Sequence, residues 1–134
     1  MSISGWRPEY SLNIALLDEH HQKLFAGIQQ LKDSYGTHEE IPVIYETLKF
    51  FMDYAIFHFS EEERLMREHD YPHFEEHLVE HKDFVKAVRK TFVEFQRTEE
   101  FPDDFMEYLQ QWLVRHILNE DRKYQFTLHQ NGIY

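Results

Sequence analysis

The chain of 134 residues is short and acidic, with 14 Lys and Arg against 25 Asp and Glu and a formal net charge of -11. This length fits one domain, residues 1–134. The negative charge repels the phosphates of nucleic acids and of membrane lipids, so nucleic acids and membrane surfaces are poor partners. The absence of cysteine excludes disulfide bonds, thiolate metal sites and thiol catalysis.

An irregular arm is expected over residues 1 to about 11. The opening segment, MSISGWRPEY, has neither the basic start nor the apolar stretch of a secretory signal peptide. No apolar run in the sequence approaches the roughly 20 residues of a membrane span. We therefore expect a cytoplasmic protein without membrane insertion.

Four helices are predicted after the arm, over about 12–36, 42–69, 72–97 and 102–129. Pro42, Pro72 and Pro102 each suit the start of a helix, and Gly36 suits the end of the first. The connections are short, so neighbouring helices should run antiparallel. The expected fold class is all-α, an up-down-up-down four-helix bundle with an irregular N-terminal arm.

The first predicted helix has an apolar stripe with alternating spacings of three and four, the pattern of an inward face in a bundle. The stripe consists of Ile14, Leu17, His21, Leu24, Ile28 and Leu31. His20 is rotated by about 100° from it and is expected at the surface.

The second and third helices carry similar stripes that also contain polar residues. The second stripe consists of Ile44, Leu48, Phe51, Ala55, His58, Glu62 and Leu65, and the third of Phe74, His77, His81, Phe84, Val88 and Phe95. Glu61 and Glu63 flank the second stripe and His73 lies beside the third, so all three are expected to be solvated.

The stripe of the fourth helix changes phase by one residue. Its first half holds Phe105, Leu109, Trp112 and His116, and its second half holds Ile117, Asp121, Tyr124 and Leu128. Residues five apart differ by about 140° around an ideal α-helix, too far for His116 and Asp121 to point at one spot. A π-bulge between them would bring both inward.

Seven polar residues on these stripes should meet at one end of the bundle. They come early in the first and third helices and late in the second and fourth, which is the same end when neighbours run antiparallel; they are His21, His58, Glu62, His77, His81, His116 and Asp121. Buried without a metal, each would be costly or change its protonation state. Nitrogen and carboxylate donors suit first-row metals such as iron, and seven are too many for one zinc ion but right for two ions that share ligands. The other histidines, His38, His69 and His129 among them, are expected in loops or at the surface.

Four segments resemble the hemerythrin family. They are DEHHQKL at 18–24, HFSEE at 58–62, HLVEH at 77–81 and WLVRHILNED at 112–121. The resemblance covers nearly the whole chain, including the arm around Trp6 and the turn at 71–72, and is closest to the single-domain members of the family. One departure is the pair His20 and His21, because the family usually has a non-histidine residue at the first of these positions.

The resemblance implies two iron ions bridged by Glu62, Asp121 and a solvent-derived oxo or hydroxo group. It assigns three histidines to one iron and two to the other, with one position left open; these are His77, His81 and His116, then His21 and His58. It also implies that O2 binds at the open position, in a pocket lined by Leu113, Ile117 and Phe59.

Reversible O2 binding is the function that this centre favours, for storage, for buffering or for delivery to an oxygen-using enzyme, by a monomer that is not itself an enzyme. Ferritin-like di-iron sites use four Glu and two His. Five neutral imidazoles and two carboxylates should stabilise high-valent iron less well, which favours carriage over oxidation. The alternatives are a di-iron enzyme acting on peroxide or nitric oxide and a sensor of O2 or iron that acts through a partner.

Overall fold

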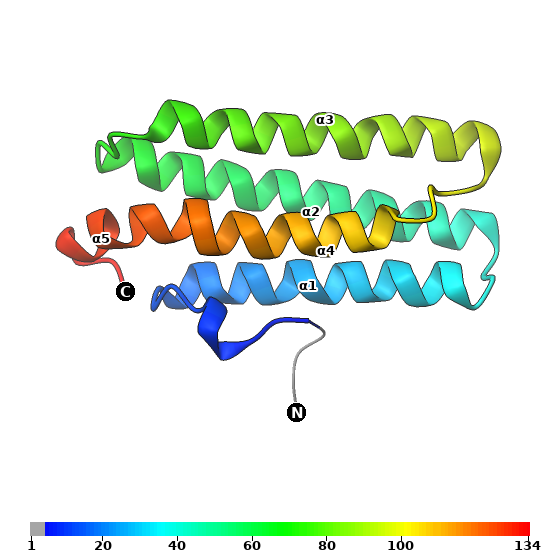
Figure 1. Cartoon of the computed structure of the whole chain (residues 1–134), viewed down its shortest axis with the longest axis horizontal. Coiled ribbons are helices and arrows are strands. Elements are labelled where there is room, and N and C mark those ends of the chain that lie inside the picture. Colours follow the sequence, from blue (N-terminus) through cyan, green and yellow to red (C-terminus); the bar gives the residue numbers. More distant parts are fainter. Residues whose placement is uncertain (1–4) are drawn as a thin grey trace.

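Long helices run back and forth along one axis in the computed structural model, which describes residues 5–134 (Figure 1). After a 3-10 turn at Pro8–Tyr10, the helices are α1 (Ala15–Gly36), α2 (Ile41–Glu68), α3 (Phe74–Thr98), α4 (Phe105–Arg115), a π-helical segment (His116–Asp121) and α5 (Arg122–Gln130). No strand occurs within residues 5–134. The all-α four-helix bundle is therefore confirmed, with α4, the π-helix and α5 forming its fourth rod; residues 1–4 of the predicted arm lie outside the described residues.

The first, third and fourth helices begin slightly later than the sequence predicts, at Ala15, Phe74 and Phe105, whereas α2 begins where it is expected. Pro42 does lie in the first turn of α2. Pro72 and Pro102, however, occupy turns that precede α3 and α4, because the amides of Phe74 and Phe105 bond to the carbonyls of Tyr71 and Pro102 at 3.2 and 3.0 Å. Pro72 takes the second position of its turn, where proline is favoured, and Pro102 takes the first position of the turn before α4.

The fourth rod contains the π-helical turn that the phase change predicts. It runs from His116 to Asp121, and both of these side chains are buried. Tyr124 and Leu128 of α5 remain fully buried beyond it. One wide turn therefore accounts for both stripes of this helix.

Aromatic side chains fill the core around the cluster of polar residues and beyond it. Phe84 stacks on Trp112 with ring centroids 4.0 Å apart, and Phe101 stacks on Phe95 at 4.3 Å. Trp112 also stacks on His116 at 4.5 Å. Large rings thus close the space between the helices next to the polar end and at the opposite end.

From residue 5 onward, the N-terminal arm packs against the end of the bundle that holds the polar residues (Figure 1). The Arg122 guanidinium donates to the carbonyl of Glu9 at 2.6 Å, and Tyr10 stacks on Phe25 with centroids 5.8 Å apart. None of the described helices combines the length and the apolar character that crossing a membrane requires.

Candidate metal centre

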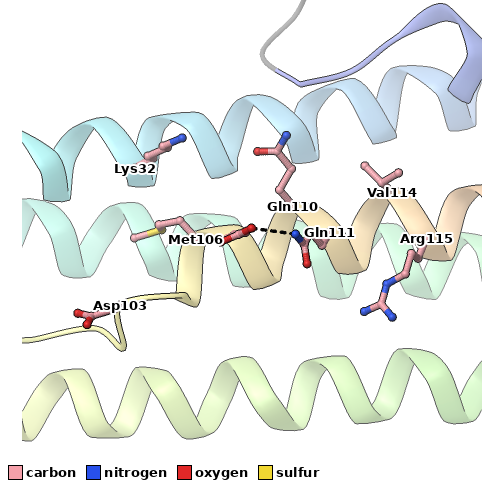
Figure 2. Close-up of a pocket in the computed structure, with 8 residues that line it drawn as sticks. Lys32, Asp103, Met106, Gln110, Gln111, Val114 and Arg115 are labelled. Carbon is pink, nitrogen blue, oxygen red and sulfur yellow. Dashed lines mark hydrogen bonds between the residues drawn. The ribbon is translucent and has the colours of Figure 1, made fainter.

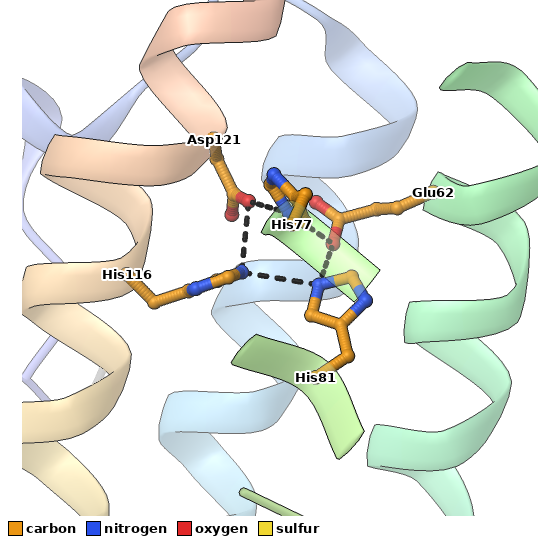
Figure 3. A group of neighbouring side chains, drawn as sticks. All are labelled: Glu62, His77, His81, His116 and Asp121. Atoms are coloured by element: carbon orange, nitrogen blue, oxygen red, sulfur yellow. Dashed lines mark hydrogen bonds and ion pairs between the residues drawn. The ribbon is translucent and has the colours of Figure 1, made fainter. Parts of the chain in front are cut away.

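The seven polar residues of the four stripes meet at one end of the bundle, and we call them the seven-residue cluster: His21, His58, Glu62, His77, His81, His116 and Asp121. Each is at most 2% exposed. Figure 3 shows five of them turned toward one another from α2, α3 and the π-helix. The prediction that these side chains meet at one end of the bundle, although neighbouring helices run in opposite directions, is confirmed.

The cluster consists of two overlapping groups, each able to hold a metal ion. One group is Glu62, His77, His81, His116 and Asp121, and the other is His21, His58, Glu62 and Asp121. Within each group one nitrogen or oxygen atom from every residue lies within 4.8 Å of the others. Glu62 and Asp121 belong to both groups, so any two ions held here would share these carboxylates.

Asp121 divides its two oxygens between the groups. Its Oδ1 lies 2.9 Å from Nε2 of His77 and 3.1 Å from Nε2 of His116. Its Oδ2 lies 3.1 Å from Nε2 of His21. The side chain therefore faces both groups at once.

Glu62 is divided in the same way. Its Oε1 lies 3.2 Å from Nε2 of His81, whereas its Oε2 lies 3.4 Å from Nε2 of His58 and 3.6 Å from Nε2 of His21. All five histidines thus turn their Nε2 atoms toward a shared carboxylate. This arrangement is what a pair of ions bridged by two carboxylates requires.

Several buried atoms of the cluster lack a hydrogen-bond partner, which tests whether the residues fit a metal. Both ring nitrogens of His21 and His77, Oε1 of Glu62 and both oxygens of Asp121 are in this state, because their contacts with one another are close but do not have the angles of a hydrogen bond. A buried polar atom without a partner costs about 1–3 kcal/mol. Metal ions would accept the lone pairs of the two Nε2 atoms and of the carboxylate oxygens, so the donor set fits two metal ions.

Charge within the metal-free cluster favours ionised carboxylates. Burial lowers the pKa of His21 and His116, but the nearby carboxylates of Asp121 and Glu62 outweigh it and raise these pKa values to about 9 and about 10. Burial opposes ionisation of Asp121, yet the neighbouring histidines hold its pKa well below the ordinary value. The histidines and carboxylates therefore compensate one another until metal replaces the protons.

Two carboxylates outside the cluster contact two of its histidines at Nδ1, the ring nitrogen that faces away from the shared carboxylates. Nδ1 of His81 lies 2.9 Å from Oε2 of Glu63, and Nδ1 of His116 lies 3.0 Å from Oε1 of Glu80. The expectation that Glu63 is solvated is wrong, since its side chain is only 21% exposed. When Nε2 of a histidine points toward the cluster, its Nδ1 points toward the neighbouring helix. A carboxylate that lies beside the stripe of that helix can then reach it. Glu63 follows Glu62 and Glu80 precedes His81, and that adjacency was the signal available in the sequence.

Tyr124 is a further residue that the sequence analysis did not assign to the site. Its hydroxyl donates to Oε2 of Glu62, and the side chain is fully buried. Burial and the nearby carboxylates raise the pKa of Tyr124 well above its ordinary value, so it remains a donor. Its place on the inward stripe three residues after Asp121 was the clue, because a buried tyrosine needs a partner for its hydroxyl.

His20 contradicts the expectation of a surface histidine. It is 5% exposed, and its Nδ1 lies 3.0 Å from Nδ1 of His58. Rotation by about 100° from the stripe directs this position into the contact between α1 and α2 rather than into solvent. Of the other histidines outside the cluster, His38 and His73 are exposed, and His69 and His129 are half-buried.

The three residues predicted to line an O2 pocket are all buried: Phe59, Leu113 and Ile117. The ring of Phe59 stacks on His81 at 4.0 Å and lies 5.9 Å from that of His58. Leu113 and Ile117 flank His116 along the fourth rod. Phe59 therefore contacts two histidines of the cluster, and the contact of all three side chains with O2 stays a prediction.

A surface pocket of about 750 Å³ between α1 and α4 lies outside this site (Figure 2). Its lining includes Lys32, Met106 and Gln110. Gln111, also in the lining, donates to Glu107 one helical turn earlier at 2.9 Å. It shares no residue with the cluster. The pockets that do touch cluster residues are smaller ones, beside His81 and beside His116.

The Glu63→Gln and Glu80→Gln variants are expected to bind metal about 10- to 100-fold more weakly, because each replaces the anionic acceptor behind a histidine with a neutral one, and the imidazole then donates electrons to the metal less strongly. Titration of the metal-free variants with Co²⁺, followed by visible absorption, measures this change. Glu61→Gln is the matched control, since Glu61 pairs with Arg64 and contacts no histidine of the cluster. Equal affinity in all three variants would show that the outer carboxylates do not support the site.

A family model, two sequence relatives and a solved structure that match this chain are all hemerythrins, and each match covers most of the chain. Residues 12–125 match the model of the hemerythrin HHE cation binding domain. The chain is 32% identical over 123 residues to a myohemerythrin of Theromyzon tessulatum, covering 92% of each chain, and 30% identical over 128 residues to a bacteriohemerythrin of Clostridium acetobutylicum, covering 89% of this chain and 96% of the relative. A crystal structure of wild-type hemerythrin superposes with a TM-score of 0.86 at 27% identity, covering 96% of this chain and 97% of the other.

Proposed function

The chain belongs to the hemerythrin family, and from this premise we propose that it binds O2 reversibly at two iron ions held by the seven-residue cluster. The observation that carries the proposal is the sharing of Glu62 and Asp121 by two groups of buried histidines. We propose that the whole chain forms one domain and acts as a monomer. Its role would be oxygen storage, buffering or delivery to an oxygen-using enzyme.

The two groups differ in size, and this difference supports a vacant position for O2. Glu62 and Asp121 would bridge the ions together with a solvent-derived oxo or hydroxo group. Three histidines would complete one ion, namely His77, His81 and His116, whereas His21 and His58 would leave the other with one ligand fewer. When bound, the iron pair supplies electrons that O2 takes up and returns.

The residues of the chain favour release of O2 unchanged. Phe59, Leu113 and Ile117 surround the cluster with apolar surface that excludes water. Tyr124 holds Glu62 by a hydrogen bond, and two carboxylates replace the four of ferritin-like sites. Fewer anionic ligands stabilise oxidised iron less, which favours carriage over oxidation of a substrate.

Mixing the reduced, iron-loaded protein with O2 in a stopped-flow spectrometer tests the proposal. We expect a new absorption band on mixing and recovery of the diferrous spectrum when the sample is flushed with argon. The matched control is the metal-free protein, which should give no band. Rapid and irreversible conversion to a diferric form would overturn the proposal in favour of a redox function.

A further inference from the structure

His20 makes a buried contact with the cluster that the metal-binding groups do not account for. Its Nδ1 lies 3.0 Å from Nδ1 of His58, and the two rings meet edge to face with centroids 5.1 Å apart. Tyr54 and Phe57 pack on the other sides of the His20 ring at 6.0 and 5.5 Å. Since Phe57 is 49% exposed, His20 lies just beneath the surface between α1 and α2.

The direction of this hydrogen bond follows from the orientation of His58. Its Nε2 faces Oε2 of Glu62 at 3.4 Å and is the atom available to a metal. A neutral imidazole that offers one nitrogen to a metal carries its hydrogen on the other. His58 must then donate from Nδ1, and Nδ1 of His20 must accept, which leaves the hydrogen of His20 on its Nε2.

We propose that His20 is a positioning residue, which fixes the ring orientation and the tautomer of His58 for metal binding by accepting its Nδ1 hydrogen. The proposal rests on the proposed function only in that His58 binds a metal ion. It assigns to His20 the role that Glu63 and Glu80 have behind His81 and His116.

The outer partners differ in charge between the two groups. Carboxylates accept from His81 and His116, whereas a neutral imidazole accepts from His58. An anionic acceptor makes a metal-bound imidazole a stronger electron donor than a neutral one does. His20 therefore orients His58 while leaving the ion of the smaller group with less electron density than its neighbour.

Packing alone is the rival explanation, because His20 also fills space between Tyr54, Phe57 and His58. Two replacements separate the explanations. In His20→Asn the side-chain carbonyl oxygen occupies the position of Nδ1 and can accept the hydrogen, while His20→Leu has nearly the same shape and no acceptor. The pair therefore changes hydrogen bonding at nearly constant volume.

Co²⁺ titration of the metal-free full chain and of both variants tests the proposal. We expect the wild type to bind two ions, His20→Asn to stay within a few-fold of it, and His20→Leu to bind one of the two ions about 10- to 100-fold more weakly. Equal binding by both variants, whether at the wild-type level or weakened alike, would overturn the role of the hydrogen bond. Failure of the wild type to bind two ions would count against the proposed function instead.

Nuclear magnetic resonance of the ¹⁵N-labelled, zinc-loaded protein gives a readout that packing cannot mimic. A proton on Nδ1 of His58 should show coupling across the hydrogen bond to Nδ1 of His20. The coupling should vanish in His20→Leu, and the proton should remain protected from exchange in His20→Asn. A hydrogen found on Nδ1 of His20 in the loaded wild type would overturn the assignment.

Discussion

The Asp121→Leu variant is expected to lose both metal ions. Asp121 belongs to both groups, and its oxygens lie within 3.1 Å of Nε2 atoms of His21, His77 and His116. Removing it takes one ligand from each ion and one bridge from the pair. The loss of affinity should exceed the roughly 10- to 100-fold that follows removal of an outer partner. Metal analysis after dialysis against iron or Co²⁺ measures the stoichiometry.

Two comparisons make the Asp121 result specific. Asp121→Asn retains one oxygen and the shape of the side chain, so it should keep a single weakly bound ion. Glu120→Gln changes a neighbouring carboxylate that pairs with Lys123 and contacts no histidine of the cluster, and it should bind two ions as the wild type does. Two ions in Asp121→Leu, with helical content unchanged, would mean that the carboxylate is not a ligand.

Removal of the metal is expected to lower the melting temperature by about 25 °C. Each ion bound only to the folded chain stabilises it by about 4 kcal/mol when free metal is roughly a thousand times Kd. Two ions would therefore contribute about 8 kcal/mol, and a domain of this size loses about 3 °C per kcal/mol. The buried atoms of His21, His77 and Asp121 that lack partners would again be unsatisfied in the metal-free protein.

Thermal unfolding followed by circular dichroism, with and without a chelator, measures this difference. Asp121→Leu is the appropriate control, because a chelator should not change its melting temperature if it binds no metal. Identical melting of the loaded and metal-free wild type would contradict a buried site of seven ligands.

The sequence predicts the fold and the cluster well because both follow from helical periodicity. Each stripe buries a face of a helix, and a polar residue on that stripe must be buried with it. The phase change between His116 and Asp121 even indicates the π-helix, since the two residues could not otherwise face the same point. Helix starts at α3 and α4 are less predictable because Pro72 and Pro102 suit a turn as well as a helix.

The pattern of a single helix brings the residues around the cluster close to its stripe, but it does not predict their contacts with other helices. Glu63, Glu80 and His20 lie beside their stripes and contact histidines on other helices. Whether such a position faces solvent or a neighbouring helix depends on how closely the two helices approach. Helical periodicity gives the direction of a side chain around the axis of its own helix. It does not say which residues of a neighbouring helix that side chain meets.

The π-helical turn holds one residue more than a regular α-helix would place between His116 and Asp121. Residues four apart on an α-helix differ by about 40° around the axis, so a segment shortened by one residue and wound as a regular α-helix would still turn both side chains inward. Rewinding the full-length segment as an α-helix would instead rotate Asp121, Tyr124 and Leu128 by about 100°, out of the core in which all three are buried. The wide turn therefore absorbs an extra residue without changing which face of the fourth rod lies in the core.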